Sequence, residues 1–362
     1  MSTTTVGAPL TNSLTAGKLP KHTSLAVLAA SWLVAGAVFL MLQLSGASED
    51  FNIAGTLVFG TVLYGIAIYL LSYFVEGVRK AKDRLVTALV TAAFVVALLP
   101  LASLVVTTVT NGLPAFLTPT FFTSSQRNVV GAGGGALHAV VGTLLITGLA
   151  GIISVPIGLL AAIYLTEYGR GRLARGITFF VDVMTGIPSI VAGLFAFALF
   201  SLLFDDPGIR FGFGGAIALC VLMIPVVVRS SEEMLKLVPN ELREAAYALG
   251  VPKWLTIVKV VLPTSIAGII TGVMISISRV IGETAPLLII SGFTASMNYN
   301  LFSERMMTLP VFVYNQYANQ GTDAQAYIDR AWAGALTLIL IVMVLNGLAR
   351  LIAKIFSPKL GR

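Results

Sequence analysis

The dominant feature of this chain is a series of long apolar runs that recurs from one end to the other. A helix of about 20 apolar residues is long enough to cross a bilayer core of about 30 Å. Eight runs reach this length, at about 24–44, 52–75, 84–109, 135–165, 177–204, 212–230, 263–291 and 332–355. Only 11% of the residues are charged, well below the share of about 25% in a soluble domain. The sequence therefore predicts an all-α integral membrane protein with eight transmembrane helices.

The distribution of basic residues predicts which side of the membrane each loop faces. If the amino terminus is cytoplasmic, the inner segments hold most of the Lys and Arg residues, and the outer segments hold Arg127, Arg210, Arg305 and Arg330. Cytoplasmic loops of membrane proteins are enriched in positive charge, so we expect both termini in the cytoplasm. This bias also explains the net charge of +7. The basic residues are spread over several loops without interleaved aromatics, so no nucleic-acid partner is expected.

Composition divides the chain into three parts. Residues 1–23 are rich in Ser, Thr and Gly and are expected to form a disordered cytoplasmic N-terminus. Residues 24–75 hold two additional transmembrane helices, and the polar loop at 76–84 then returns the chain to the inner face. Residues 82–357 hold the six remaining spans. The long polar segment at 291–331 is expected to include a short surface helix.

Several classes of site are not expected from the residue content. Cys220 is the only cysteine, and the two histidines, His22 and His138, are far apart, so neither a disulfide nor a metal site is expected. No Ser/His/Asp set indicates catalysis. A Gly-x-x-x-x-Gly-Lys-Ser/Thr loop does not occur, so the chain is not expected to hydrolyse ATP itself. Any energy from ATP would arrive through a partner.

The polar segment between the sixth and seventh runs predicts two short helices on the inner side. Pro239 suits the first turn of a helix. Small and apolar residues then recur at helical spacing and form one narrow face: Leu242, Ala245, Ala246 and Leu249. Gly250 suits a left-handed stop, and Pro252 begins a second short helix that leads into the bilayer. The pattern alone fits a helix lying on lipid or a helix that contacts a soluble partner.

Two charges lie inside the seventh apolar run. Glu283 follows Arg279 by four residues, so a continuous helix would place both side chains on one face. A charge at the centre of a span costs about 2.5–3.5 kcal/mol, and such residues normally face a bundle interior or a water-filled path. Two explanations remain open, a structural ion pair and a path for a solute.

The inner loop resembles a known transporter signature. The spacing of Glu244-Ala245-Ala246, Gly250 and the residues at 260–263 is similar to the EAA signature of permease subunits in ABC importers, with Val260 where that family often has Ile. In those proteins the loop forms a coupling helix that fits a cleft on the ATP-binding subunit. The resemblance implies ATPase coupling for four residues, Glu244, Ala245, Ala246 and Gly250.

A second motif narrows the resemblance. The segment SRVIGETAPLLIISGF at 278–293 resembles the Gly-Glu-Thr-Ala-Pro-Leu-Leu segment of A-type permease subunits of phosphate ABC importers. Further likeness lies in GGGALHAVVGTL, IYLTEYGRG, GIPSIVAGLF, PVVVRSSEEMLKLVPNELREAAYALG and AWAGALTL, and covers roughly residues 82–357. The first 75 residues have no counterpart in the shorter members of that family.

The resemblance implies a six-helix permease core with two extra N-terminal transmembrane helices and a cytoplasmic coupling helix. It implies a multi-pass protein of a prokaryotic plasma membrane that moves inorganic phosphate into the cytoplasm by ATP-driven alternating access. The implied substrate path includes Arg279, Glu283, Thr284 and Arg229. A guanidinium suits this path because it stays protonated and offers paired donors to phosphate oxygens.

The roles of individual residues in the path stay open. Glu283 would either hold Arg279 in place or accept a proton from phosphate. Arg229 would either attract phosphate at the inner exit or anchor the span as an inner positive charge. Asp182 is expected to cap a helix or to pair with Arg175.

Prolines predict irregular helices beside the same path. Pro286 is expected to kink the seventh span because it removes one backbone hydrogen bond. Pro188 and Gly193 suggest a broken helix beside the path, although close helix packing alone explains small residues there.

The resemblance also implies partners. These are a C-type sister permease, a homodimeric ATP-binding subunit and an extracytoplasmic phosphate-binding protein that docks on the outer loops, all around a core embedded in membrane lipid. ATP and Mg would be bound by the partner ATPase, and this chain would hold no cofactor of its own. Two alternatives remain: an ABC permease for another oxyanion, such as molybdate or sulfate, and a self-contained secondary anion transporter.

Overall fold

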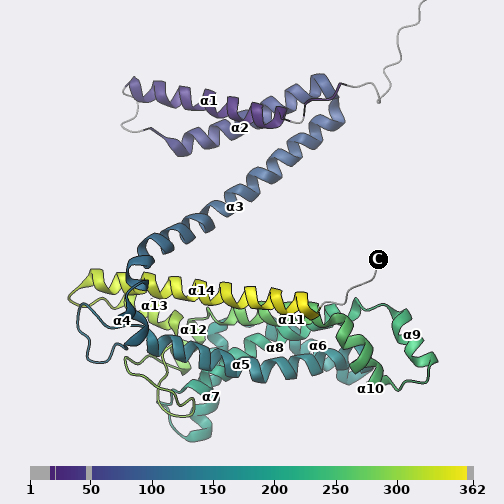
Figure 1. The fold of residues 1–362 in the computed structure, drawn as a ribbon, viewed down its shortest axis with the longest axis vertical. Coiled ribbons are helices and arrows are strands. Elements are labelled where there is room, and N and C mark those ends of the chain that lie inside the picture. Colours follow the sequence, from purple (N-terminus) through teal and green to yellow (C-terminus); the bar gives the residue numbers. More distant parts are fainter. Residues whose placement is uncertain (1–16, 21, 46–50, 357–362) are drawn as a thin grey trace, which may run out of the picture. The chain divides into compact units, whose positions relative to one another are not determined.

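The computed structural model describes residues 17–20, 22–45 and 51–356, and every regular element in these ranges is a helix (Figure 1). The predicted all-α class is confirmed. Most of the predicted disordered segment, 1–23, lies outside the described residues. Contacts divide the chain into two compact units, Met1–Val105 and Val106–Arg362, and the boundary falls within helix α3 (Val78–Phe116).

Seven helices in the described ranges are long and apolar enough to cross a membrane, and a bent pair of helices stands at the eighth predicted span. One of the eight runs, 177–204, is broken into α6 (Arg172–Thr185) and α7 (Ser189–Phe204), which are bent by 110° about the residues around Pro188. The other runs correspond to these seven helices, although only the first part of the run at 263–291 is covered: α1 (Thr23–Leu44), α2 (Ile53–Glu76), α3, α5 (Leu137–Ile163), α8 (Gly212–Lys236), α11 (Leu262–Val280) and α14 (Ala324–Phe356). The chain is therefore a multi-pass membrane protein.

In the first unit, α1 and α2 pack as a helical hairpin. The absence of a side chain at Gly60 lets the helices approach closely, since a Cβ there would lie 2.3 Å from Cδ1 of Trp32. Glu76, the last residue of α2, is buried and accepts a hydrogen bond of 2.6 Å from Nε of Arg84. The loop predicted at 76–84 is shorter than expected, because only Gly77, with φ of 90°, separates α2 from α3.

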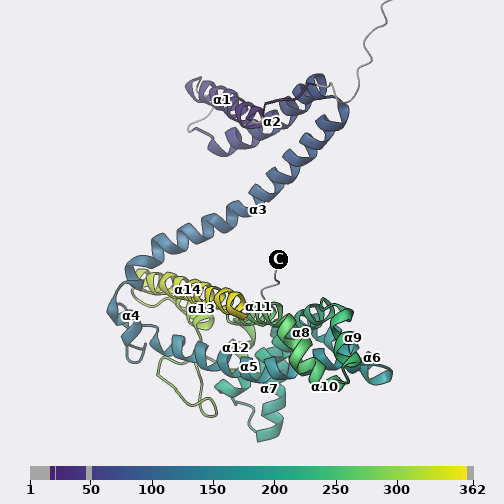
Figure 2. The same ribbon diagram turned by 45° about the vertical axis from the view of Figure 1, so that its right-hand side comes forward.

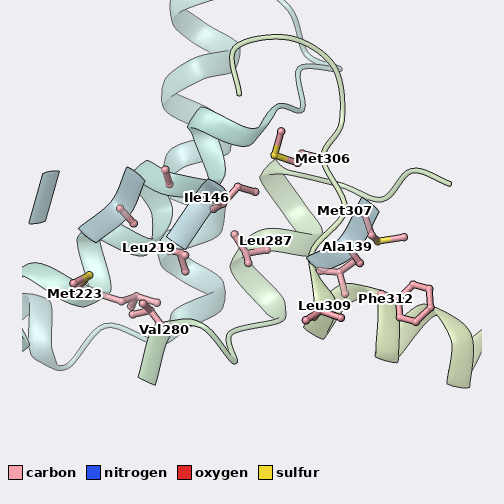
Figure 3. Close-up of a cluster of buried hydrophobic side chains, with 14 of the residues drawn as sticks. Ala139, Ile146, Leu219, Met223, Val280, Leu287, Met306, Met307, Leu309 and Phe312 are labelled. Carbon is pink, nitrogen blue, oxygen red and sulfur yellow. The ribbon is translucent and has the colours of Figure 1, made fainter. Parts of the chain in front are cut away.

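In the second unit, α5 and α8 pack closely along their length. Gly158 makes this possible, because a Cβ there would lie 2.7 Å from Cγ1 of Val227. Figure 3 shows the buried apolar cluster of this unit, in which Leu287 lies beside Ile146 and Leu219. Leu287 belongs to α12 (Ala285–Ile290), so this short helix is held inside the core rather than at its surface.

The two ends of the second unit carry different short helices. One end carries α4 (Pro119–Thr123) and α13 (Leu309–Ala318), and the other carries α9 (Asn240–Ala248) and α10 (Lys253–Thr256) beside the end of α6 (Figures 1 and 2). Helix α13 is the short helix expected within 291–331. It is not a simple surface helix, because Leu309 and Phe312 are fully buried.

Candidate functional site

The predicted inner loop forms the two short helices expected from the sequence. Pro239 lies immediately before α9 rather than within its first turn. Gly250 has φ of +74°, so the predicted left-handed stop is confirmed. Pro252 precedes α10, which continues through a π-helical turn (Ile257–Val261) into α11. The loop is therefore joined to the seventh span without a break.

The predicted apolar face of α9 is only partly covered by the rest of the chain. Ala246 is buried, with 8% of its surface exposed, whereas Leu242 and Leu249 are 42% and 84% exposed. Ala245 and Glu244 are also exposed. We call the exposed residues Leu242, Glu244, Ala245 and Leu249 the loop surface. An exposed apolar group of this kind indicates a contact with another molecule.

The end of α5 holds the loop in place, a contact that the sequence did not predict. The helix widens into a π-helical turn (Tyr164–Tyr168), in which Glu167 accepts hydrogen bonds from Nε and Nη2 of Arg243 at 3.1 and 2.9 Å. The side chains of this pair are 6% and 14% exposed. The sequence does show an acidic residue, Glu167, between two tyrosines at the end of an apolar run, which could have indicated a buried charge. Its partner Arg243 could not be identified in this way, because it lies far away in the sequence.

The seventh apolar run is interrupted at residues 281–284. Helix α11 ends at Val280 and α12 begins at Ala285, so the prediction that Arg279 and Glu283 share one helical face is wrong. The reason is local: Gly282 weakens the helix, and Pro286 removes a backbone donor and restricts the residue before it. The helix therefore breaks ahead of Pro286 instead of kinking at it.

Three of the predicted path residues lie at this break: Arg279 in the last turn of α11, and Glu283 and Thr284 in the segment before α12. Arg279 is exposed at the end of α11, whereas Glu283 and Thr284 are partly buried. In the ranges that the structure describes, neither Arg279 nor Glu283 forms an ion pair. The backbone N–H of Glu283 donates to the carbonyl of Val280 at 3.1 Å, which closes the last turn of α11.

The second predicted irregularity lies against the first. A Cβ on Gly193 of α7 would lie 2.5 Å from Cα of Pro286, so α7 and α12 are in backbone contact. Pro188 stands at the bend between α6 and α7. The broken helix predicted from Pro188 and Gly193 therefore packs directly beside the interrupted seventh run.

Arg229 belongs to a separate cluster of charges. Its guanidinium pairs with Asp182 of α6 and with Oε2 of Glu232, the latter at 2.9 Å. Lys236 donates to the other oxygen of Glu232 at 2.7 Å. The predicted pair of Asp182 with Arg175 is wrong, because α6 and α8 pack together and bring Arg229 to Asp182 instead.

A surface hollow of about 690 Å³ lies away from these residues. Its lining includes Arg210 and Arg305, together with Asp206 and Glu304, from the segments that follow α7 and α12. Positive and negative side chains are balanced there, so the hollow does not mark an anion site. No group of three or more His, Cys, Asp or Glu residues in the described ranges is placed to hold a metal ion.

Comparisons with a protein family and with individual proteins both match this chain to membrane components of transport systems. The family described as binding-protein-dependent transport system inner membrane component matches residues 154–362. The phosphate transport system permease protein PstA 1 of Mycobacterium tuberculosis is 45% identical over 278 residues, which is 76% of this chain and 89% of that protein. PstA of Pasteurella multocida is 39% identical over 285 residues, or 78% and 96% of the two chains.

A solved structure shares the fold. The bacterial alginate ABC transporter, crystallised with an alginate-bound periplasmic protein, has a chain that superposes with a TM-score of 0.55 at 13% identity, covering 78% of this chain and 97% of that one. This likeness concerns the helical fold alone. On the family match and on the identity to the PstA proteins, the chain belongs to the binding-protein-dependent transport system inner membrane component family, as a permease subunit of the PstA type.

Proposed function

We propose that this protein is the A-type permease subunit of an ABC importer for inorganic phosphate. The identity of the solute as phosphate is supported by the relatives, which are named phosphate transport system permease proteins. The observation that carries the proposal is Arg279, a charged residue without an ion-pair partner in the described ranges, next to a helix break within an apolar run. A charge kept in such a place at a cost of about 2.5–3.5 kcal/mol is typical of a solute path.

The chemistry of phosphate fits these residues. The Arg279 guanidinium offers two parallel donors to a tetrahedral oxyanion, and the Thr284 hydroxyl provides a further donor. Glu283 repels the same anion and thereby prevents tight trapping, since conduction requires a site that the ion can leave. Arg229, which is already paired with two carboxylates, would act at most as a secondary attraction at the inner exit.

Transport is driven by a partner in this proposal. A homodimeric ATPase binds ATP and Mg and displaces the loop surface. The loop then transmits this motion to the spans through Glu244, Ala245, Ala246 and Gly250. A C-type sister permease completes the pathway, and an external phosphate-binding protein delivers the anion. The helices then alternate between outward and inward access, with both termini in the cytoplasm, as the distribution of positive charge predicts.

The function is tested with the chain co-expressed with its partner subunits and reconstituted into liposomes, with ATP inside and the binding protein outside. Radiolabelled phosphate should accumulate against its gradient only when ATP is present, and sulfate and molybdate should not. Accumulation of either other oxyanion in place of phosphate would replace the proposed substrate. Uphill phosphate uptake by the purified chain alone would show a secondary transporter instead.

A further inference from the structure

The predicted cytoplasmic end of α5 has an unusual backbone shape. The five residues that follow it, Tyr164–Tyr168, form a π-helical turn, and such turns often occur at functional positions. Gly169 ends the turn, and a Cβ there would lie 2.8 Å from the carbonyl oxygen of Leu165. The widened turn places the carboxylate of Glu167 against the inner loop, where only 6% of the side chain is exposed.

The carboxylate of Glu167 meets a guanidinium that already joins two helices. Arg243, in α9, donates through Nη1 to the carbonyl of Val238 at 2.6 Å and through Nη2 to the carbonyl of Leu235 at 3.0 Å. These carbonyls belong to the end of α8 and the turn after it, where carbonyl groups no longer have the regular partners of a helix interior, although the carbonyl of Leu235 also accepts from the N–H of Val238 at 3.3 Å. One guanidinium therefore connects the ends of α5 and α8 with α9.

The same glutamate also contacts the second arm of the loop. Its backbone carbonyl accepts a hydrogen bond from Nζ of Lys253, the first residue of α10. The ammonium group of Lys253 also lies 4.8 Å from the ring centroid of Tyr168, within the range of a cation–π contact. Gly250 lies between the two arms, so Glu167 holds α9 through its side chain and α10 through its backbone.

Helix α5 continues from this contact into the core beside the helix break. Ile146 of α5 belongs to the same buried cluster as Leu287 of α12. A Cβ on Gly215 would touch both, at 3.5 Å from Cδ1 of Ile146 and 3.1 Å from Cδ2 of Leu287. Helix α5 is thus in packed contact with the loop at one end and, through this cluster, with the segment that follows residues 281–284.

We propose that Glu167 is a positioning residue that fastens α5 to both arms of the α9–α10 loop, so that a displacement of the loop surface by the ATPase also moves α5. The inference rests on the proposed function, since it concerns how ATP hydrolysis is passed to the spans. Glu167 itself lies outside the loop surface and is too buried to contact the ATPase. Removing one partner from a buried ion pair leaves a charge uncompensated, so the effect of a substitution is expected to be large.

The test is the amount of phosphate imported per ATP hydrolysed by the complete importer in liposomes. Glu167→Gln should lower this ratio about tenfold, equivalent to about 1.4 kcal/mol, while the complex still assembles and hydrolyses ATP with an unchanged KM for ATP. The matched control is Glu233→Gln, which removes an exposed carboxylate from α8 that forms no ion pair in the described ranges. The control should keep the wild-type ratio.

A second variant keeps the buried pair intact. Lys253→Met removes only the contact of an exposed side chain with α5, and should lower the ratio by about threefold. If Glu167→Gln prevents assembly, Lys253→Met decides the question. Wild-type ratios in both variants, or in Lys253→Met alone when the other does not assemble, would overturn the positioning role. A wild-type complex that imports no phosphate would instead overturn the proposed function.

Discussion

The inner loop region and the break in the seventh run use charge in opposite ways. Near the loop, three acidic side chains, those of Glu167, Asp182 and Glu232, are paired with basic residues of other helices or of the next helical turn. At the break, Arg279 and Glu283 form no ion pair in the described ranges, although they are close in sequence. The pairs Glu167–Arg243 and Asp182–Arg229 join different helices, whereas both pairs of Glu232 lie within α8. Charges left without a partner remain available to a solute or to another subunit.

The largest effect is expected from the unpaired arginine. Arg279→Ala should reduce ATP-driven phosphate uptake by roughly 100-fold, because two charge-assisted hydrogen bonds to the anion, each about 1.5–3 kcal/mol, are lost. Arg279→Lys should retain part of the activity, since an ammonium group keeps the charge but not the paired donors. Uptake is measured in liposomes, and the amount of co-purified ATPase shows that the complex is still assembled.

The control for this comparison is Arg350→Ala, which removes an exposed arginine that likewise forms no ion pair in the described ranges but lies in the last turns of α14. Its uptake should stay within about twofold of the wild type. Equal losses in the two arginine variants would mean that the position at the break has no special role, and the contrast between the two regions would fail.

The next largest effect is expected from the close packing of α7 against α12, the helix that follows the break. Gly193→Ala would place a Cβ 2.5 Å from Cα of Pro286, and the required separation of α7 from α12 should cost about 1–3 kcal/mol. The apparent Tm of the detergent-solubilised complex should fall, and uptake should fall with it. Gly148→Ala is the matched control, because nothing lies within 4 Å of a Cβ at that position of α5. A Tm for Gly193→Ala as high as that of the control would show that α12 moves freely.

The sequence predicted features that depend on local chemistry. The apolar runs, the left-handed stop at Gly250 and the helix start after Pro252 all follow from residue type and spacing, and the structure has each of them. The break at 281–284 had a readable signal in Gly282 and Pro286, but a continuous apolar run masks such a signal. The pairs Asp182–Arg229 and Glu167–Arg243 depend on which helices pack together, so neither could be predicted from one sequence.

The loop region should show a smaller effect. Gly250→Ala forces a side chain into a backbone conformation with φ of +74°, at a cost of about 1–2 kcal/mol. Phosphate uptake per ATP should fall several-fold, whereas Gly250→Asn, which tolerates this conformation better, should fall less. Gly176→Ala, in α6 with open space around it, serves as the control. Equal ratios for all three variants would show that the turn conformation is not needed for coupling.

The smallest effect is expected where a paired charge is exposed. The Asp182 and Arg229 side chains are 58% and 35% exposed, and ion pairs at such sites contribute about 0–1 kcal/mol. Asp182→Asn should therefore leave the Tm nearly unchanged and alter uptake by less than about threefold. A loss as large as that of Arg279→Ala would place the α6–α8 contact in the transport path and remove the distinction between paired and unpaired charges.

The central claim is that the break at 281–284 lines the path of the anion, and cysteine accessibility tests it most directly. Gly282 is exposed and nothing lies within 4 Å of a Cβ there, so Gly282→Cys should be tolerated in a chain whose only native cysteine, Cys220, is replaced by Ala. In the assembled importer, a charged, membrane-impermeant thiol reagent should label this cysteine, and saturating phosphate should slow the labelling. A cysteine that is never labelled, or whose labelling phosphate does not change, would contradict the account.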